Sequence, residues 1–311
     1  VLMVTALADL FYTGSRKMFC VSAVLFWTGI MGVTLFRKEG RYLVVITLLM
    51  FLLACRRYWK ILLCGMALCC FALVLEQGYM NYHSIPAGPM GESLSVPLLQ
   101  TARYLQEHPE DITEEEREIL GRVFTADIHT VANSYNPLIS DGVKLYFLEH
   151  PTKQDMADYF KVWLNQLCRH PDTYVQAFLH HIHGYFYPNV HVFQNYRAQF
   201  YLLDGDQCDA EALDIRFGVK DGKLREILAN GLELWEKIPV LGMLLSPGLY
   251  VCLLLGECVY FAAKRRKEIL LMIPELCVLA ICMLSPVNAY MRYVLPLMAL
   301  APLALAWCCV K

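Results

Sequence analysis

Residues 18–36 read MFCVSAVLFWTGIMGVTLF, and this uncharged run of 19 residues decides the fold class. A helix needs about 20 apolar residues to cross the hydrocarbon of a bilayer, because it rises about 1.5 Å per residue. Inside lipid the backbone must satisfy its own hydrogen bonds, and a helix does so. The run therefore predicts a transmembrane helix.

Similar apolar runs lie on both sides of one long polar segment. They fill residues 1–12, 42–55 and 59–76 before it, and 241–263, 268–284 and 291–310 after it. We expect an all-α, polytopic transmembrane protein with one large, mostly helical extracytoplasmic domain. Its three parts are about four transmembrane helices at 1–76, the polar domain at 77–240, and three transmembrane helices at 241–311. The opening run is short for a span and lacks an initiator Met, so we expect the C-terminal part of a longer protein.

Charge separates the polar segment from the apolar parts. Residues 77–240 hold 23 acidic and 13 basic side chains, a net charge of −10, whereas the remaining residues carry +8. The basic residues of the apolar parts stand at helix ends, where lipid headgroups and phosphates lie. We therefore expect membrane lipids as partners, and no nucleic acid.

The distribution of Lys and Arg predicts the orientation, because cytoplasmic loops are richer in both. With the polar segment outside, ten basic residues of the short connections fall inside and four fall outside. The inside group is Arg16, Lys17, Arg56, Arg57, Lys60, Lys264, Arg265, Arg266, Lys267 and Lys311. The polar segment is therefore expected on the outer side.

The four outer basic residues are Arg37, Lys38, Arg41 and Arg292, and the three arginines form a candidate phosphate site. Arg37 and Arg41 flank a short turn, and Arg292 and Tyr293 begin the last apolar run. The guanidinium fork of arginine suits a phosphate group because it donates two parallel hydrogen bonds. Gly40 would let the backbone turn closely. The simpler alternative is that these side chains snorkel to lipid phosphates.

The polar segment reads as mostly helical. Thr113 and Glu116 form a capping box, and Thr152 with Asp155 forms a weaker one. Asp172 is expected to cap the helix that follows Pro171, and a last helix is expected at about 223–236.

Several polar residues in this segment are weighed as functional. Glu92 is a candidate base or acceptor-binding group, with Arg103 close behind it, although Glu92 could also cap the next helix. His180 and His183 share a helix face, but no cysteine or carboxylate follows at ligand spacing, so we expect no metal site. Cys168 and Cys208 could pair if the segment faces an oxidising compartment.

Six stretches resemble a family of bacterial multi-spanning membrane proteins. They are Phe36-Arg37-Lys38-Glu39-Gly40, Glu92-Ser93-Leu94-Ser95-Val96-Pro97, Tyr135-Asn136-Pro137 with Ser140-Asp141, Tyr159-Phe160-Lys161-Val162-Trp163, Leu245-Ser246-Pro247-Gly248, and Ser285-Pro286-Val287-Asn288 with Arg292-Tyr293 and Leu295-Pro296. The resemblance covers nearly the whole chain. The family is an uncharacterised one related to the GT-C glycosyltransferases, membrane enzymes that use lipid-linked sugars. Where that family usually shows Arg-Asn-Gly, this chain has Arg37-Lys38-Glu39-Gly40.

The resemblance implies an enzyme of the bacterial cytoplasmic membrane that transfers a sugar from a polyprenyl-phosphate donor to an envelope glycan or lipid acceptor. GT-C enzymes carry their catalytic Asp or Glu in the first outer loop, so we expect that carboxylate in an absent N-terminal part. We assign no catalytic residue and no cofactor here.

Non-enzymatic alternatives stay open. The chain could be a transporter or flippase of a lipid-linked intermediate, a scaffold for envelope assembly, or a sensor whose outer domain binds peptide or glycan. Glu257 and Glu275 lie within apolar runs, and ionisable groups at that depth are typical of transporters.

Overall fold

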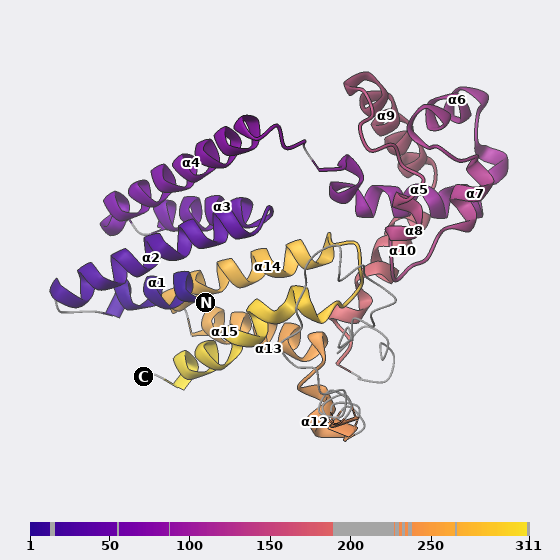
Figure 1. Cartoon of the computed structure of the whole chain (residues 1–311). Helices are drawn as coiled ribbons and strands as arrows, with labels where there is room; N and C mark the ends of the chain where they lie inside the picture. Colours follow the sequence, from indigo (N-terminus) through magenta and orange to yellow (C-terminus); the bar gives the residue numbers. More distant parts are fainter. Residues whose placement is uncertain are drawn as a thin grey trace.

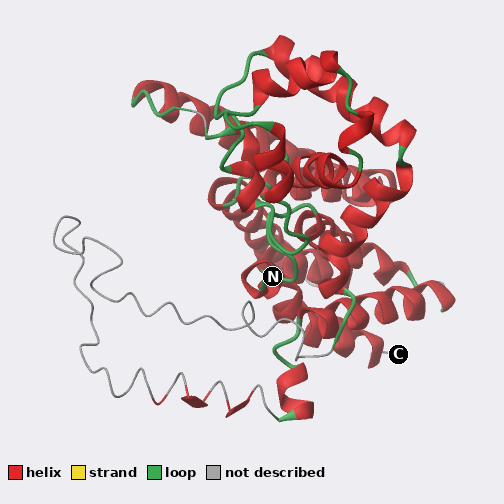
Figure 2. Ribbon diagram, turned by 90° about the vertical axis from the view of Figure 1, so that its right-hand side faces the viewer, coloured by secondary structure: helices red, strands yellow, loops and turns green. Residues whose placement is uncertain are grey.

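The structure is a computed structural model that describes residues 1–12, 16–54, 56–86, 88–188, 239–264 and 266–309, with a few residues between 227 and 238. Across these residues it is all-α, as expected: they form no strand, and their only β-pairings are two isolated bridges. Figure 2 shows the helical content directly. Cys208 and most of the helix expected at 223–236 lie outside the described residues.

Apolar helices form one half of the molecule. They are α1 Leu2–Tyr12, α2 Arg16–Phe36, α3 Gly40–Ala54 and α4 Trp59–Tyr82, then α13 Pro247–Ala263, α14 Ile273–Met283 and α15 Met291–Cys309. Segments Lys17–Phe36, Trp59–Tyr82 and Met291–Cys309 are long and apolar enough to cross a membrane, and α3 and α13 are shorter apolar helices. The chain is therefore a multi-pass membrane protein.

Two of the other expected spans, 241–263 and 268–284, form helices that are shorter than their apolar runs. The run at 268–284 is divided into the 3₁₀ helix η6, Lys267–Met272, and α14, which has 11 residues. Pro274 stands in the first turn of α14, where its missing N–H costs no helical hydrogen bond, so the proline marks a new helix start rather than the middle of a span.

The N-terminal and C-terminal apolar helices pack into one bundle. Figure 1 shows them side by side, with the polar domain at one end. Helix α2 packs on α1, α3 and α4, whereas α15 packs on α13 and α14, and α14 also meets α3. One continuous apolar core runs through these helices and includes Phe26, Phe51 and Phe261.

The polar domain, defined here as residues 90–185, has a second core. Its elements are η2 Met90–Ser93, α5 Ser95–Glu107, η3 Pro109–Asp111, α6 Glu114–Val123, α7 Ile128–Asn133, α8 Asp141–Lys144, α9 Lys153–Arg169, α10 Pro171–Ile182 and η4 His183–Tyr185. Helix α5 lies in the middle and packs on α7, α8, α9 and α10. Tyr104, Tyr159 and Tyr174 are fully buried in this core. A further short helix, α12 Pro239–Met243, precedes α13.

Two of the three predicted helix caps are confirmed. Thr113 Oγ accepts from the Glu116 N–H, and Glu116 Oε2 accepts from the Thr113 N–H, each at 3.2 Å. Thr152 Oγ accepts from the Asp155 N–H at 3.1 Å. The prediction that Asp172 caps α10 is wrong: Pro171 opens this helix and His170 is its cap residue, without a side-chain bond.

The polar domain holds the segment between α14 and α15 through backbone hydrogen bonds. The Ser140 N–H donates to the Pro286 carbonyl, and the Asn288 N–H donates to the Leu138 carbonyl, both at 2.9 Å. Ile139 and Val287 form an isolated antiparallel bridge between these bonds. We call residues 285–288 the joint segment.

Side chains complete this joint. Asn288 is 1% exposed, and its amide accepts from the Gly184 N–H at 3.2 Å and donates to the His180 carbonyl at 3.3 Å. Tyr185 donates its hydroxyl to the Val287 carbonyl at 3.3 Å. At Gly248, in the first turn of α13, a Cβ would lie 2.5 Å from the Tyr187 carbonyl oxygen, so only glycine allows this approach.

His181 stands at the centre of the joint. Its Nε2 lies 2.7 Å from the Ser285 carbonyl, and its Nδ1 lies 3.2 Å from the Pro137 carbonyl. Burial lowers the pKa of His181, although both carbonyls favour the charged ring and act in the opposite direction.

We predict that the protein loses stability as the pH falls through the unfolded pKa of histidine, about 6.5. The unfolded chain then takes up a proton that folded His181 resists, so the unfolded state is favoured. The unfolding temperature of the detergent-solubilised protein should therefore fall between neutral and mildly acidic pH. His181→Asn should reduce this slope of unfolding temperature against pH. The exposed His150→Asn is the control and should leave it unchanged. Equal slopes for wild type and His181→Asn would contradict the assignment.

Candidate functional site

The basic turn between α2 and α3 is compact. Helix α2 ends at Phe36, and the Gly40 N–H donates to the Arg37 carbonyl at 2.8 Å. A Cβ at Gly40 would overlap the Val33 carbonyl oxygen, so a larger residue would force the two helices apart. Gly40 therefore allows the close turn that the sequence predicts, through lack of a side chain.

Two of the predicted phosphate-binding arginines gather on one aromatic ring. The guanidinium carbon of Arg37 lies 6.0 Å from the centre of the Tyr293 ring, and that of Arg292 lies 5.4 Å from it. Arg292 also lies 5.0 Å from the Tyr290 ring, and Arg37 forms an ion pair with Glu39 at 3.5 Å. We call Arg37, Arg292 and Tyr293 the basic cluster. Each arginine–ring contact contributes about 0.5–1 kcal/mol at an exposed position.

Arg41 bonds within its own turn. Its Nε donates to the Lys38 carbonyl at 2.7 Å, and its guanidinium carbon lies 5.9 Å from the Tyr42 ring. The turn thus carries Arg37 toward Tyr293, whereas Arg41 lies along the start of α3.

An apolar crevice of about 170 Å³ opens beside Arg37. It follows α14 from Ile281 to Pro274, a distance of about 10 Å along the helix axis. Helices α1, α2, α3 and α15 supply its other walls, through Val1, Met3, Val4, Gly32, Val33, Phe36, Gly40, Leu43, Pro296 and Leu300. A narrow apolar space with a cation near one end suits an amphiphile with an anionic head and a hydrocarbon tail.

The joint segment determines where Arg292 lies. Ala289 follows it directly, is buried, and has φ of 49, in the left-handed region that non-glycine residues rarely adopt. Helix α15 begins two residues later, at Met291. The same hydrogen bonds that hold Asn288 therefore fix the position from which Arg292 and Tyr293 project.

Glu92 lies on the polar domain and is paired. Lys144 Nζ lies 2.9 Å from Glu92 Oε2 and 2.7 Å from Asp141 Oδ1. Burial opposes the charge on Lys144, but the two carboxylates outweigh it and raise the pKa of the ammonium group. A hollow of about 430 Å³ adjoins these residues and Glu149. Glu92 does not cap α5, because the cap residue is Leu94.

Arg103 is a buried link between α5 and α10. Its guanidinium donates to Glu107 Oε1 and Gln176 Oε1, both at 2.8 Å, and to His180 Nδ1 at 3.0 Å. These contacts lie within the polar domain and join the two helices. A functional role for Arg103 stays a prediction.

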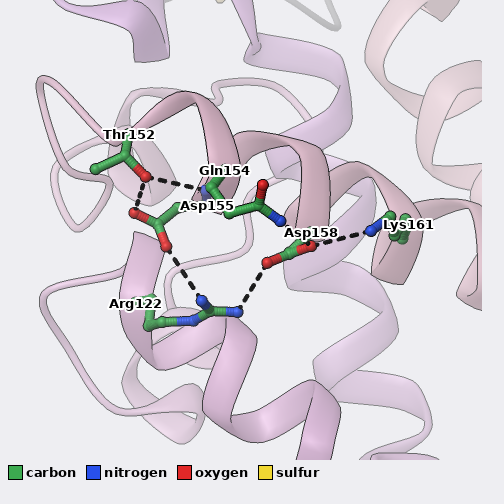
Figure 3. Close-up of polar contacts among 6 residues, drawn as sticks. All are labelled: Arg122, Thr152, Gln154, Asp155, Asp158 and Lys161. Carbon is green, nitrogen blue, oxygen red and sulfur yellow. Dashed lines mark hydrogen bonds and ion pairs between the residues drawn. The ribbon is translucent and has the colours of Figure 1, made fainter.

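A second polar group joins α6 to α9. Arg122 contacts Asp155 at 3.4 Å and Asp158 at 3.1 Å, and Lys161 also reaches Asp158, at 3.2 Å (Figure 3). Hydrogen bonds from Gln154, Lys161 and Arg122 lower the pKa of Asp158. A groove of about 840 Å³ runs past this group and is lined by charges of both signs. The sequence did not predict this group, although the spacing of Asp155 and Asp158 by three residues places both on one helix face.

Comparisons with known proteins identify the family. No curated protein and no solved structure matches the chain. A family model described as a family of unknown function (DUF6020) matches residues 13–311. Because this match includes the basic turn, the polar domain, the joint segment and the last helix, the chain belongs to the family of unknown function DUF6020.

Proposed function

We propose that this protein transfers a sugar from a polyprenyl-phosphate donor to an acceptor of the cell envelope, on the outer face of the bacterial cytoplasmic membrane. One observation carries the proposal: Arg37 and Arg292 meet at Tyr293 beside an apolar crevice. The donor's phosphate would bind to the guanidinium groups, and its isoprenoid tail would enter the crevice between α2, α3, α14 and α15. The likeness to GT-C glycosyltransferases supports the same substrate class.

The chemistry follows from charge. When the sugar leaves, negative charge grows on the lipid phosphate, and a positioned guanidinium stabilises that charge more in the transition state than in the ground state. Glu39, which pairs with Arg37 at 3.5 Å, would be displaced by the phosphate. The polar domain would hold the acceptor, and the hollow beside Glu92, Asp141 and Lys144 offers groups that can bond sugar hydroxyls.

The proposal predicts that the polar domain faces outward. Cys168 is an exposed thiol on α9, so a membrane-impermeant maleimide should label it in intact cells that carry the protein with Cys208→Ser. Cys168→Ser should remove the label. A cysteine introduced by Lys264→Cys should react only after the cells are permeabilised. The reverse pattern would refute the orientation.

Loss of a guanidinium should weaken phosphate binding. A hydrogen bond to a charged group contributes about 1.5–3 kcal/mol, so Arg292→Ala should weaken polyprenyl phosphate binding about ten- to a hundredfold. Arg292→Lys should recover only part of the lost affinity, because lysine keeps the positive charge but lacks the two parallel N–H donors of the guanidinium. Native mass spectrometry of the purified protein with polyprenyl phosphate measures both.

Arg57→Ala provides the matched control. Arg57 also lies against a tyrosine ring, that of Tyr58 at 5.7 Å, but it follows the opposite end of α3. Arg57→Ala should leave the affinity for polyprenyl phosphate unchanged. Wild-type affinity in Arg292→Ala would show that the basic cluster does not bind the phosphate.

A transporter of the same lipid is the second candidate, and two buried carboxylates favour it. Glu257 on α13 and Glu275 on α14 are 4% and 1% exposed. Both carboxylate oxygens of Glu257 and Oε1 of Glu275 have no hydrogen-bond partner in the part of the chain that the structure describes. Ionisable groups in such positions line ion pathways in transporters.

Paired variants separate the two candidates. For a transferase, release of labelled sugar from a polyprenyl-phosphate sugar should survive Glu257→Gln and Glu275→Gln, and should fall about ten- to a hundredfold in Arg292→Ala, as lipid binding does. For a transporter, the glutamine variants should stop movement of a fluorescent lipid phosphate across proteoliposomes, and no sugar should be released. Glu76→Gln on α4 is the control for a carboxylate lost from an apolar helix.

A further inference from the structure

Two His-Pro dipeptides bring their imidazole rings together on the polar domain. His108 stands between α5 and η3, and His170 between α9 and α10. A residue before proline is kept out of the helical region, and both histidines have φ of −131, with ψ of 52 and 70. Their rings stack with centroids 3.7 Å apart, next to the ring of Tyr104.

Asp111 adds a carboxylate to this pair. Its Oδ2 lies 2.7 Å from His170 Nε2. One possible ligand atom from each of His108, Asp111 and His170 lies within 4.8 Å of the other two. Imidazole nitrogen and carboxylate oxygen are ligands that Zn²⁺ and related divalent ions accept. All three residues are partly exposed, so water can complete the coordination.

Hydrogen bonding shows which nitrogen of His108 is available. The Thr173 hydroxyl donates its single proton to Glu107 Oε2 at 3.1 Å, so it must accept from His108 Nε2, which lies 2.9 Å away. Neutral His108 therefore carries its proton on Nε2 and presents an unprotonated Nδ1. Glu107 is itself held by Arg103 at 2.8 Å. In metal-bound histidines the ring nitrogen that does not bind the metal usually donates a hydrogen bond in this way, and this bond fixes the tautomer and the ring orientation.

We propose that His108, Asp111 and His170 bind one divalent transition-metal ion of the zinc class. Binding through Nε2 of neutral His170 requires its proton to move to Nδ1 by exchange with water, so the ring stays a neutral imidazole. Binding also turns one imidazole out of the stack, since two parallel rings cannot both direct their in-plane lone pairs at one ion. Partial exposure of both side chains makes this rotation possible without opening the core. The site stands apart from the basic cluster and does not depend on the proposed sugar transfer.

Binding of Co²⁺ and Zn²⁺ to the purified full chain in detergent tests this site. The thiols are first alkylated, because the 13 cysteines would otherwise compete for either ion. We expect one equivalent of Co²⁺, with the visible absorption of nitrogen and oxygen ligands and without thiolate charge-transfer bands. Zn²⁺ should raise the midpoint of thermal unfolding, because it binds the folded state.

Single variants and one double variant locate the ion. Thr173→Val keeps all three ligands and removes the support of His108, so affinity should fall about ten- to a hundredfold. His108→Ala and His170→Ala should lose more, and Zn²⁺ should no longer raise their unfolding midpoints. His150→Ala is the matched control, since His150 also precedes a proline in the same domain but is exposed and outside the cluster. A wild type that binds no ion, or a His108→Ala/His170→Ala double variant that binds it as tightly, would overturn the proposal.

Discussion

The capture of residues 285–288 by the polar domain is the constraint on which the remaining arrangement depends. This segment leaves the bundle at the end of α14 and returns at α15; Asn288 is buried on the way, and the other three residues are partly buried. A buried polar group without a partner costs about 1–3 kcal/mol. Leu138, Ser140 and Gly184 provide the partners. These hydrogen bonds join the polar domain to the bundle, together with Ile182 and Tyr185, which pack in the apolar core of the bundle, and Arg292 takes its position from this joint.

The sequence was sufficient for features that depend on local composition. Residues 18–36 form α2 because a long uncharged run needs no distant partner to become a helix in lipid. Thr113 and Glu116 cap α6 because both bonds lie within one turn. It failed where two local signals competed. Asp172 is a good capping residue, but Pro171 already suits the first helical position, so the helix starts two residues earlier than an Asp172 cap would place it. Pro274 divides an apolar run in the same way.

The candidate site shows the same division. The alternation of short connections predicted that Arg37 and Arg292 lie at one end of the bundle, and both contact Tyr293. Charge pattern alone did not distinguish these two arginines from Arg41 or Arg103. Arg41 bonds to Lys38, and Arg103 lies on a helix that is buried on nearly all sides. The charge pattern also missed His108, Asp111 and His170, because Asp111 and His170 are 59 residues apart and meet only through packing of α5 on α9 and α10.

The large sequence separation across the joint sets an order of assembly. The bonds from Ser140 to Pro286 and from Asn288 to the residues before it span 146 and more than 100 positions. Because the chain is made from its N-terminus, α1 to α4 and the polar domain have been synthesised before Pro286 leaves the ribosome. The joint can therefore close only after α13 and α14 exist. Arg292 can meet Arg37 only after that, so a chain truncated before α15 lacks the complete basic cluster.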